Sequence, residues 1–213
     1  MNVAPNRRKV LIATSNAGKL RDFAGAAAMH GVRVESIPNF ASLPIPVEDG
    51  TTFAENAIKK ANEYSLAVPG EIVVADDSGL EVDALDGAPG VHSARFAADQ
   101  PHLSDSNTDD ELNNVRLVRE LENTPDDRRT GRYVAVLAAA RDGRTLRTFR
   151  GTAEGMILRI PRGTQGFGYD PYFYFPSLYR TFAELDPEEK SKYSHRGEAF
   201  RKFLAWYLAQ PEG

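Results

Sequence analysis

Two neighbouring carboxylates, Asp76 and Asp77, directly follow the apolar run Ile72 to Ala75. That run is typical of a buried strand, and we expect the strand to stop at the acids, which puts at least one carboxylate at the ligand-binding edge of a sheet. Adjacent carboxylates repel each other unless a cation or hydrogen-bond donors lie nearby. Mg²⁺ prefers oxygen ligands and binds through one or two carboxylates plus substrate phosphates. The pair therefore indicates either a site for Mg²⁺ and phosphate or an ordinary solvated turn.

A magnesium site of this kind needs a further acid from elsewhere in the chain, and two glutamates are candidates. Glu55 stands three residues after Thr52, which is the spacing of a capping box, so it already has a role at a helix start. Glu48 lies in a proline-containing loop and has no such local role. We rank Glu48 higher as a metal ligand and treat Glu55 as a supporting residue. The alternative is that both are solvated.

A second phosphate signal lies near the N-terminus, where a short apolar run is followed by a turn and a helical pattern. Free backbone N–H groups at the start of a helix attract phosphate, and a lysine there adds a point charge. The segment lacks the paired glycines of a P-loop. The alternative is an ordinary helix start with a solvated lysine. The candidate phosphate-binding residues are Thr14, Ser15, Asn16, Ala17, Gly18 and Lys19.

Two further segments carry groups that suit a flat, polar ligand. The glycine-rich segment 163–171 offers Phe167 as a stacking face and Asp170 as a hydrogen-bond acceptor for a base. Its alternative is a glycine-rich turn with core aromatics. Hydrogen-bond donors gather further on, at Lys190, Ser194, His195 and Arg196. A lone histidine is most often structural, and we find no zinc-like spacing of ligands.

The elements that must position these residues alternate between strands and helices. We expect strands over 9–13, 32–37 and 71–75, and a hairpin over 133–149 around Asp142-Gly143. Capping boxes at Thr52 and Thr108 open two helices, Asp186 opens a short helix that carries Lys190, and a helix follows Ser194. This order predicts one α/β domain over residues 1–213, with a mixed sheet flanked by helices.

Composition excludes several classes of function. The net charge is −4, so no basic excess favours binding to a nucleic-acid polymer. The longest apolar run, 134–140, is far shorter than a membrane span, so we expect no membrane association. The absence of cysteine excludes disulfides and thiol chemistry and fits a cytoplasmic location.

Six segments, taken in order, closely resemble the inosine triphosphate pyrophosphatase family, also called non-canonical purine nucleoside triphosphate or dITP/XTP pyrophosphatases. The likeness runs from about Val10 to Phe203. It implies hydrolysis of inosine, deoxyinosine and xanthosine triphosphates to monophosphate and pyrophosphate with Mg²⁺, which cleanses the nucleotide pool. It also implies a homodimer and an elongated α/β fold of two lobes with an active-site cleft between them. The segments are 14–19, 48–57, 75–80, 87–95, 166–171 and 190–197.

The resemblance also implies a role for each matching residue. Residues Thr14 to Lys19 and Lys60 would contact the triphosphate. Glu48 and Asp77 would hold Mg²⁺, and Asp77 would accept the proton of the attacking water. Asp76 would support them. The residues that would position the nucleotide are Ser78, Phe167, Gly168, Tyr169, Asp170, Lys190, His195 and Arg196.

The expected preference for inosine and xanthosine follows from hydrogen-bond donors. These bases present an oxygen at ring position 6, which accepts from Lys190, His195 or Arg196, whereas adenine presents an amino group that leaves buried donors unpaired. Two alternatives remain at this point. One is a related pyrophosphatase that acts on pyrimidine or modified nucleotides. The other is a nucleotide-binding regulator without turnover, although such a regulator has little need for Glu48 and Asp77 around phosphate.

Overall fold

The computed structural model describes residues 8–14, 17–28, 30–99 and 108–210. Its strands form one sheet in the order β2-β1-β3-β4-β5-β6-β7. β1 runs parallel to β2 and β3, whereas β6 is antiparallel to β5 and β7. The predicted mixed α/β sheet is therefore confirmed. The strands are β1 Lys9–Ile12, β2 Arg33–Ser36, β3 Val73–Val82, β4 Thr130–Arg141, β5 Arg144–Ile157, β6 Phe173–Phe175 and β7 Arg180–Thr181.

Three of the helices begin where local capping signals place them. Thr52 accepts a hydrogen bond from the N–H of Glu55, whose side chain accepts from the N–H of Thr52, and Thr108 and Glu111 repeat this arrangement. Asp186 accepts from the N–H of Glu189 at the start of the short helix, as predicted. The α-helices are α1 Ala17–Ala28, α2 Phe53–Ser65, α3 Asp109–Glu120, α4 Pro187–Tyr193 and α5 His195–Leu208.

β3 differs from the prediction, because it does not stop at the acids. The strand continues through Asp76, Asp77, Ser78 and Gly79 to Val82. Its pairing with β1 covers Val73 and Val74, so β4, its neighbour on the other side, is the strand that can continue the pairing past the charged residues. The acids therefore lie inside a strand rather than in a turn after it.

The chain divides into two compact units. The first comprises Met1–Asp77, Ala135–Gly151 and Arg196–Gly213, and the second comprises Ser78–Val134 and Thr152–His195. β3, β4 and β5 contribute residues to both. The single domain and the cleft between two lobes stay predictions. Among the described residues, no helix has both the length and the apolar character that a membrane span requires.

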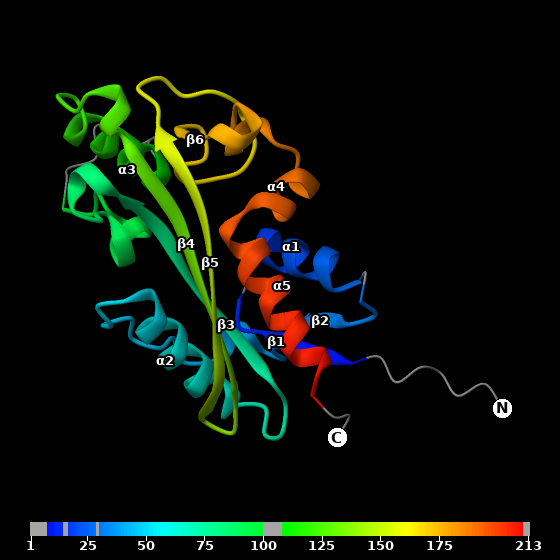
Figure 1. Ribbon diagram of the computed structural model, residues 1–213. Coiled ribbons are helices and arrows are strands. Elements are labelled where there is room, and N and C mark those ends of the chain that lie inside the picture. The colour runs from blue at the N-terminus through cyan, green and yellow to red at the C-terminus, as the bar shows by residue number, and fades with distance from the viewer. Residues whose placement is uncertain (1–7, 15–16, 29, 100–107, 211–213) are drawn as a thin grey trace. The chain divides into compact units, whose positions relative to one another are not determined.

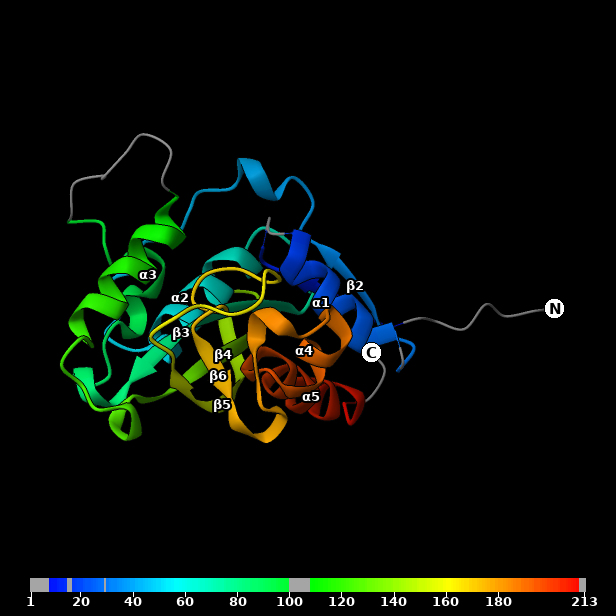
Figure 2. The ribbon, with the colours of Figure 1, turned by 90° about the horizontal axis from the view of Figure 1, so that it is seen from above.

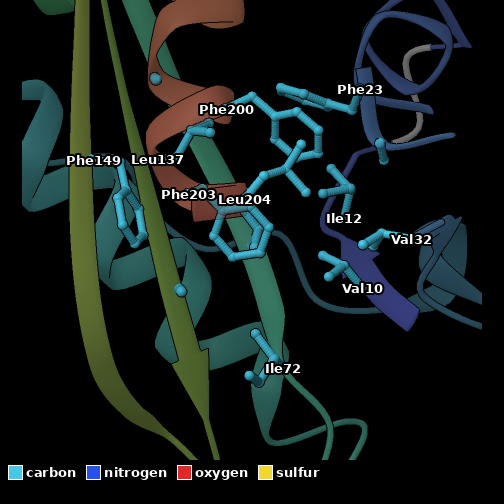
Figure 3. Close-up of a cluster of buried hydrophobic side chains, with 14 of the residues drawn as sticks. Val10, Ile12, Phe23, Val32, Ile72, Leu137, Phe149, Phe200, Phe203 and Leu204 are labelled. Atoms are coloured by element: carbon cyan, nitrogen blue, oxygen red, sulfur yellow. The ribbon is translucent and has the colours of Figure 1, made fainter. Parts of the chain in front are cut away.

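The first unit has helices on both faces of its part of the sheet. Val10 and Ile12 of β1 pack with Phe23 of α1 and with Phe200 and Phe203 of α5 (Figure 3). The rings of Phe23 and Phe200 lie 4.7 Å apart, and α1 and α5 run side by side in both ribbon views (Figures 1 and 2).

The opposite face of the same strands is covered by α2 (Figure 1). Leu11 and Val73 belong to a separate cluster with Tyr64 of that helix. Residues along a strand alternate between its faces, so even-numbered and odd-numbered positions of β1 and β3 meet different helices. This alternation decides where the two acids of β3 point.

The second unit has a core of its own. Leu80 and Val82 of β3, Leu117 of α3, and Phe173 and Phe182 form its buried cluster. The rings of Phe173 and Phe182 lie 4.9 Å apart. This core supports the glycine-rich segment that the sequence marks as a candidate base site.

Candidate active site

The two acids of β3 point to opposite faces of the sheet, because they are neighbours in a continuous strand. Asp76 lies on the same face of β3 as Val74, which packs in the cluster with α1 and α5. Asp77 lies on the same face as Val73, which packs in the cluster with α2. The mutual repulsion expected from adjacent carboxylates is reduced in this way, because each acid meets its own cation.

Asp76 is buried and carries two cations on one oxygen. Its Oδ2 lies 2.7 Å from Nζ of Lys19 in α1 and 3.2 Å from Nε of Arg196 in α5. Burial alone would raise the pKa of Asp76, but the charges of Lys19 and Arg196 hold it well below its usual range. The carboxylate therefore stays ionised and fixes the positions of two side chains that suit phosphate.

Asp77 shares a cation with Glu48 on the other face. Nζ of Lys60 lies 2.9 Å from Oδ1 of Asp77 and 3.3 Å from Oε1 of Glu48. Burial raises the pKa of Asp77 above its usual value and Glu48 adds to the rise, although Lys60 opposes both. Burial lowers the pKa of Lys60, yet Asp77 and Glu48 leave it raised overall. The Oδ2 atom of Asp77 is buried and has no hydrogen-bond partner of good geometry among the described residues, although the side chain of Asn56 lies close enough to lower the pKa of Asp77.

The loop that carries Glu48 is tied to α2. Oδ1 of the buried Asn56 accepts from the N–H of Gly50 at 2.8 Å. Glu55 accepts from the N–H groups of Thr51 and Thr52, so its carboxylate serves the loop and the helix start. Glu55 therefore holds the loop and the helix start, and its supporting role in the site stays a prediction.

Sequence reasoning did not single out Asn56, although a signal exists. Asn56 and Lys60 stand on the stripe of α2 that otherwise contains Phe53, Ala57 and Ala61. Polar residues on the buried stripe of an amphipathic helix are uncommon unless they have partners. Their position on this stripe could have marked both residues as part of a site.

The second unit gathers its candidate residues around Asp170, which is buried. Oδ2 of Asp170 accepts from Nζ of Lys190 and, at 2.9 Å, from the N–H of Phe167. Oδ1 accepts from the hydroxyl of Tyr133 at 3.3 Å. Both oxygens therefore have partners within the protein, so Asp170 fixes Lys190 and the turn at Phe167.

The aromatic residues of this group divide into one exposed ring and two buried ones. Phe167 is 45% exposed, and Nζ of Lys190 lies 4.7 Å from the centroid of its ring. Tyr169 is buried and donates its hydroxyl hydrogen to the carbonyl of Ser93, and burial raises its pKa. The buried ring of His195 stacks on Tyr133, with centroids 4.7 Å apart and planes 9° apart.

Tyr133 is a further residue that the sequence did not reveal. A tyrosine in an apolar strand is typical of a core position, and nothing in its spacing marks it as part of a site. The structure gives it two contacts with predicted site residues, the hydrogen bond to Asp170 and the stack on His195.

The remaining predicted residues are placed as follows. Thr14 is half-buried after β1, and its carbonyl accepts from the hydroxyl of Ser36. Ser15 and Asn16 lie outside the described residues, and Ala17 and Gly18 open α1. Ser78 is half-buried within β3. The first unit thus brings together Lys19, Glu48, Lys60, Asp76, Asp77 and Arg196, and the second brings together Phe167, Asp170, Lys190 and His195.

Across the described ranges, no cluster of three or more histidine, aspartate or glutamate side chains could hold a metal ion. Glu48 and Asp77 form a pair of carboxylates that approach one cation, the ammonium of Lys60. Such a pair suits a hard ion that completes its coordination with water and substrate oxygens.

Comparison with known proteins identifies the family. The model of the Ham1 family matches residues 10–206. A dITP/XTP pyrophosphatase from Acidobacterium capsulatum is 51% identical over 195 residues, which cover 91% of this chain and 95% of the relative. A second dITP/XTP pyrophosphatase, from Desulforamulus reducens, is 48% identical over a stretch that covers 92% of this chain and 94% of the relative. A Ham1 protein from Coxiella burnetii superposes with a TM-score of 0.81 at 36% identity, over 95% of this chain and 100% of that one. On this evidence the chain belongs to the Ham1 family.

Proposed function

We propose that this chain hydrolyses inosine, deoxyinosine and xanthosine triphosphates to the nucleoside monophosphate and pyrophosphate, and so keeps deaminated purines out of DNA and RNA. The names of its relatives as dITP/XTP pyrophosphatases support the substrate class. One structural observation carries the chemistry. Asp77 keeps a buried oxygen without a hydrogen-bond partner among the described residues, beside the cation that it shares with Glu48.

Glu48 and Asp77 are the residues that would hold Mg²⁺. The fit rests on the donor set, since two carboxylates already converge on one positive charge and one of their oxygens is buried without a partner in the described part of the chain. When bound, the ion neutralises negative charge on phosphate oxygens, so that a triphosphate can approach the carboxylates.

Lys19 and Arg196 would bind the phosphates of the substrate. Both side chains are held by Asp76, so little conformational freedom is lost when a phosphate binds. Lys60 would add positive charge on the other face of β3. The three cations offset the three carboxylates Glu48, Asp76 and Asp77, so the set does not repel a triphosphate as the carboxylates alone would.

Asp77 would accept the proton of the attacking water. A general base must lie within hydrogen-bonding reach of that water. No described residue donates a hydrogen bond of good geometry to the Oδ2 atom of Asp77, so this oxygen can accept one from the water. Lys60, bonded to the other oxygen, keeps the carboxylate in place during the transfer.

The second group of residues would select the base. Phe167 offers an exposed ring for stacking, and Lys190 lies over that ring as a donor that Asp170 holds in position. A 6-oxo purine would accept a hydrogen bond from Lys190 or from His195, whereas the 6-amino group of adenine would leave such a donor unpaired. The homodimer is proposed from the resemblance, and the cytoplasmic location from the absence of cysteine.

The test is product analysis of the purified chain with Mg²⁺ and each of five nucleotides, inosine, xanthosine, guanosine, adenosine and thymidine triphosphate, with pyrophosphate resolved from orthophosphate. We expect monophosphate and pyrophosphate from the first two and little product from the other three. Orthophosphate release or a pyrimidine preference would overturn the proposal. Saturable binding without turnover would identify a nucleotide-binding regulator instead.

A further inference from the structure

Helix α3 contacts the glycine-rich turn at a single residue, Gly168. Oδ2 of Asp110 accepts from the N–H of Gly168 at 2.8 Å, and Nδ2 of Asn114 donates to the carbonyl of Gly168 at 2.9 Å. The two helical residues are four positions apart and so lie on one face of α3. A single helix turn therefore pairs with both backbone polar groups of one residue in the second unit.

These contacts fix the backbone next to Phe167. Gly168 has a φ of +60°, which is in the left-handed region that favours glycine. On the other side, the N–H of Phe167 donates to Asp170, and the hydroxyl of Tyr169 donates to the carbonyl of Ser93. Every residue from 167 to 169 is thus held by a hydrogen bond, while the ring of Phe167 remains 45% exposed.

We propose that Asp110 and Asn114 are positioning residues for the nucleotide base. By holding Gly168, they keep the exposed ring of Phe167 in a fixed orientation, so that stacking on a base loses little conformational freedom. This inference rests on the proposed function, because it assumes that Phe167 stacks on the base. Neither residue would touch the substrate or the reacting atoms.

Asp110 also has a simpler role at the start of α3, and the test must distinguish that role from the positioning of Gly168. It lies in the acidic first turn of α3 with Asp109 and Glu111, where negative charge favours the positive end of the helix dipole. Asp109 shares that role, but among the described residues it makes no hydrogen bond to the turn at Phe167. It therefore provides a matched control.

The experiment compares four variants of the full chain. Asn114→Asp keeps the side-chain size but replaces the donating nitrogen with oxygen, and Asp110→Ala removes the acceptor. Asp110→Asn keeps an acceptor oxygen and is the conservative rescue. Asp109→Asn is the control. Four quantities are measured: hydrogen exchange of the Gly168 amide, kcat and KM for inosine triphosphate, and the Kd of inorganic pyrophosphate, which has no base.

We expect Asn114→Asp and Asp110→Ala to speed exchange at Gly168 and to raise KM by about five-fold, the effect of one lost hydrogen bond. The kcat and the Kd of pyrophosphate should stay close to wild type, because only base binding is affected. Asp110→Asn and Asp109→Asn should behave like wild type.

Faster exchange without a rise in KM would overturn the positioning role, and so would an equal loss of pyrophosphate affinity. Failure of the proposed function is recognised separately, because the wild-type chain would then not hydrolyse inosine triphosphate. In that case the Kd of inosine monophosphate replaces KM, and the same comparison among the four variants decides the role of α3.

Discussion

The two groups of candidate site residues are built in different ways. In the first unit, Lys19, Lys60, Asp76 and Asp77 stand on regular helices and a strand, and ion pairs join them. In the second, Phe167 stands on a turn that hydrogen bonds hold in place. The first arrangement places charge with little freedom, and the second presents an exposed ring in a defined orientation.

This difference suggests a division of labour. Fixed charges suit a phosphate chain, whose negative charge is the same for every base, and a shaped aromatic and donor surface suits the base, whose functional groups differ. Changes in the first group are therefore expected to alter turnover for all substrates. Changes in the second group are expected to alter the choice among substrates.

The largest effect is expected from Asp77→Asn. The amide has nearly the same shape but cannot accept a proton, so turnover of inosine triphosphate should fall by about 10²- to 10⁴-fold, the usual contribution of a general base. The melting temperature should stay near that of wild type, because Glu48 still pairs with Lys60 and burial disfavours the charge of Asp77. Asp49→Asn is the control, because Asp49 is an exposed acid of the same unit that pairs with Lys59. Wild-type turnover in Asp77→Asn would remove Asp77 from the chemistry.

Asp76→Asn should instead mainly reduce stability. The substitution leaves Lys19 and Arg196 without their buried counter-charge, and loss of one partner from such a pair costs about 3 kcal/mol. Urea unfolding measures the change in the free energy of unfolding. An Asp76→Asn chain as stable as wild type would show that the ion pairs of Asp76 do not hold Lys19 and Arg196 in place.

Gly50→Ala tests how the Glu48 loop is held. A Cβ at position 50 would lie 2.6 Å from Oδ1 of Asn56 and 2.8 Å from Cβ of Glu55, so the loop must shift away from α2. We expect a loss of about 1–3 kcal/mol in stability, as for other forced contacts in packed sites. Turnover should also fall, because Glu48 moves with the loop. Unchanged turnover would show that the position of Glu48 is not critical.

Tyr133→Phe should have the smallest effect, and it probes the second group. It removes the 3.3 Å hydrogen bond to Asp170 but keeps the stack on His195, so we expect a stability loss of about 1 kcal/mol. Thermal unfolding checks this value against Tyr179→Phe, whose ring is 80% exposed. The preference for inosine over adenosine triphosphate should change little. A large drop in that preference would mean that the hydroxyl, rather than the stack, orients the site.

Features that depend on local sequence could be predicted, whereas those that depend on distant partners could not. The capping boxes at Thr52 and Thr108 were confirmed because cap and partner are only three residues apart. The end of β3 was predicted wrongly, because two charges in a row are typical of a turn. Asp76 is stabilised by Lys19 and Arg196, which come from helices far away in the chain, and Asp77 by Lys60 of α2.

The same reasoning explains which site residues could be found. Glu48 was ranked above Glu55 because the capping box accounts for Glu55, and the structure brings Glu48 to Lys60. Tyr133 could not be found, since its role depends on a stack with His195 that no spacing in the sequence encodes.

The division of labour is tested most directly by making the same substitution in one lysine of each group, Lys19→Met and Lys190→Met. The measured quantity is the ratio of kcat/KM for inosine triphosphate to that for adenosine triphosphate. Lys19→Met should lower both values by a similar factor and keep the ratio, whereas Lys190→Met should bring the ratio towards one. If the ratio falls in Lys19→Met but stays at the wild-type value in Lys190→Met, the proposed separation between phosphate-binding and base-selecting residues is contradicted.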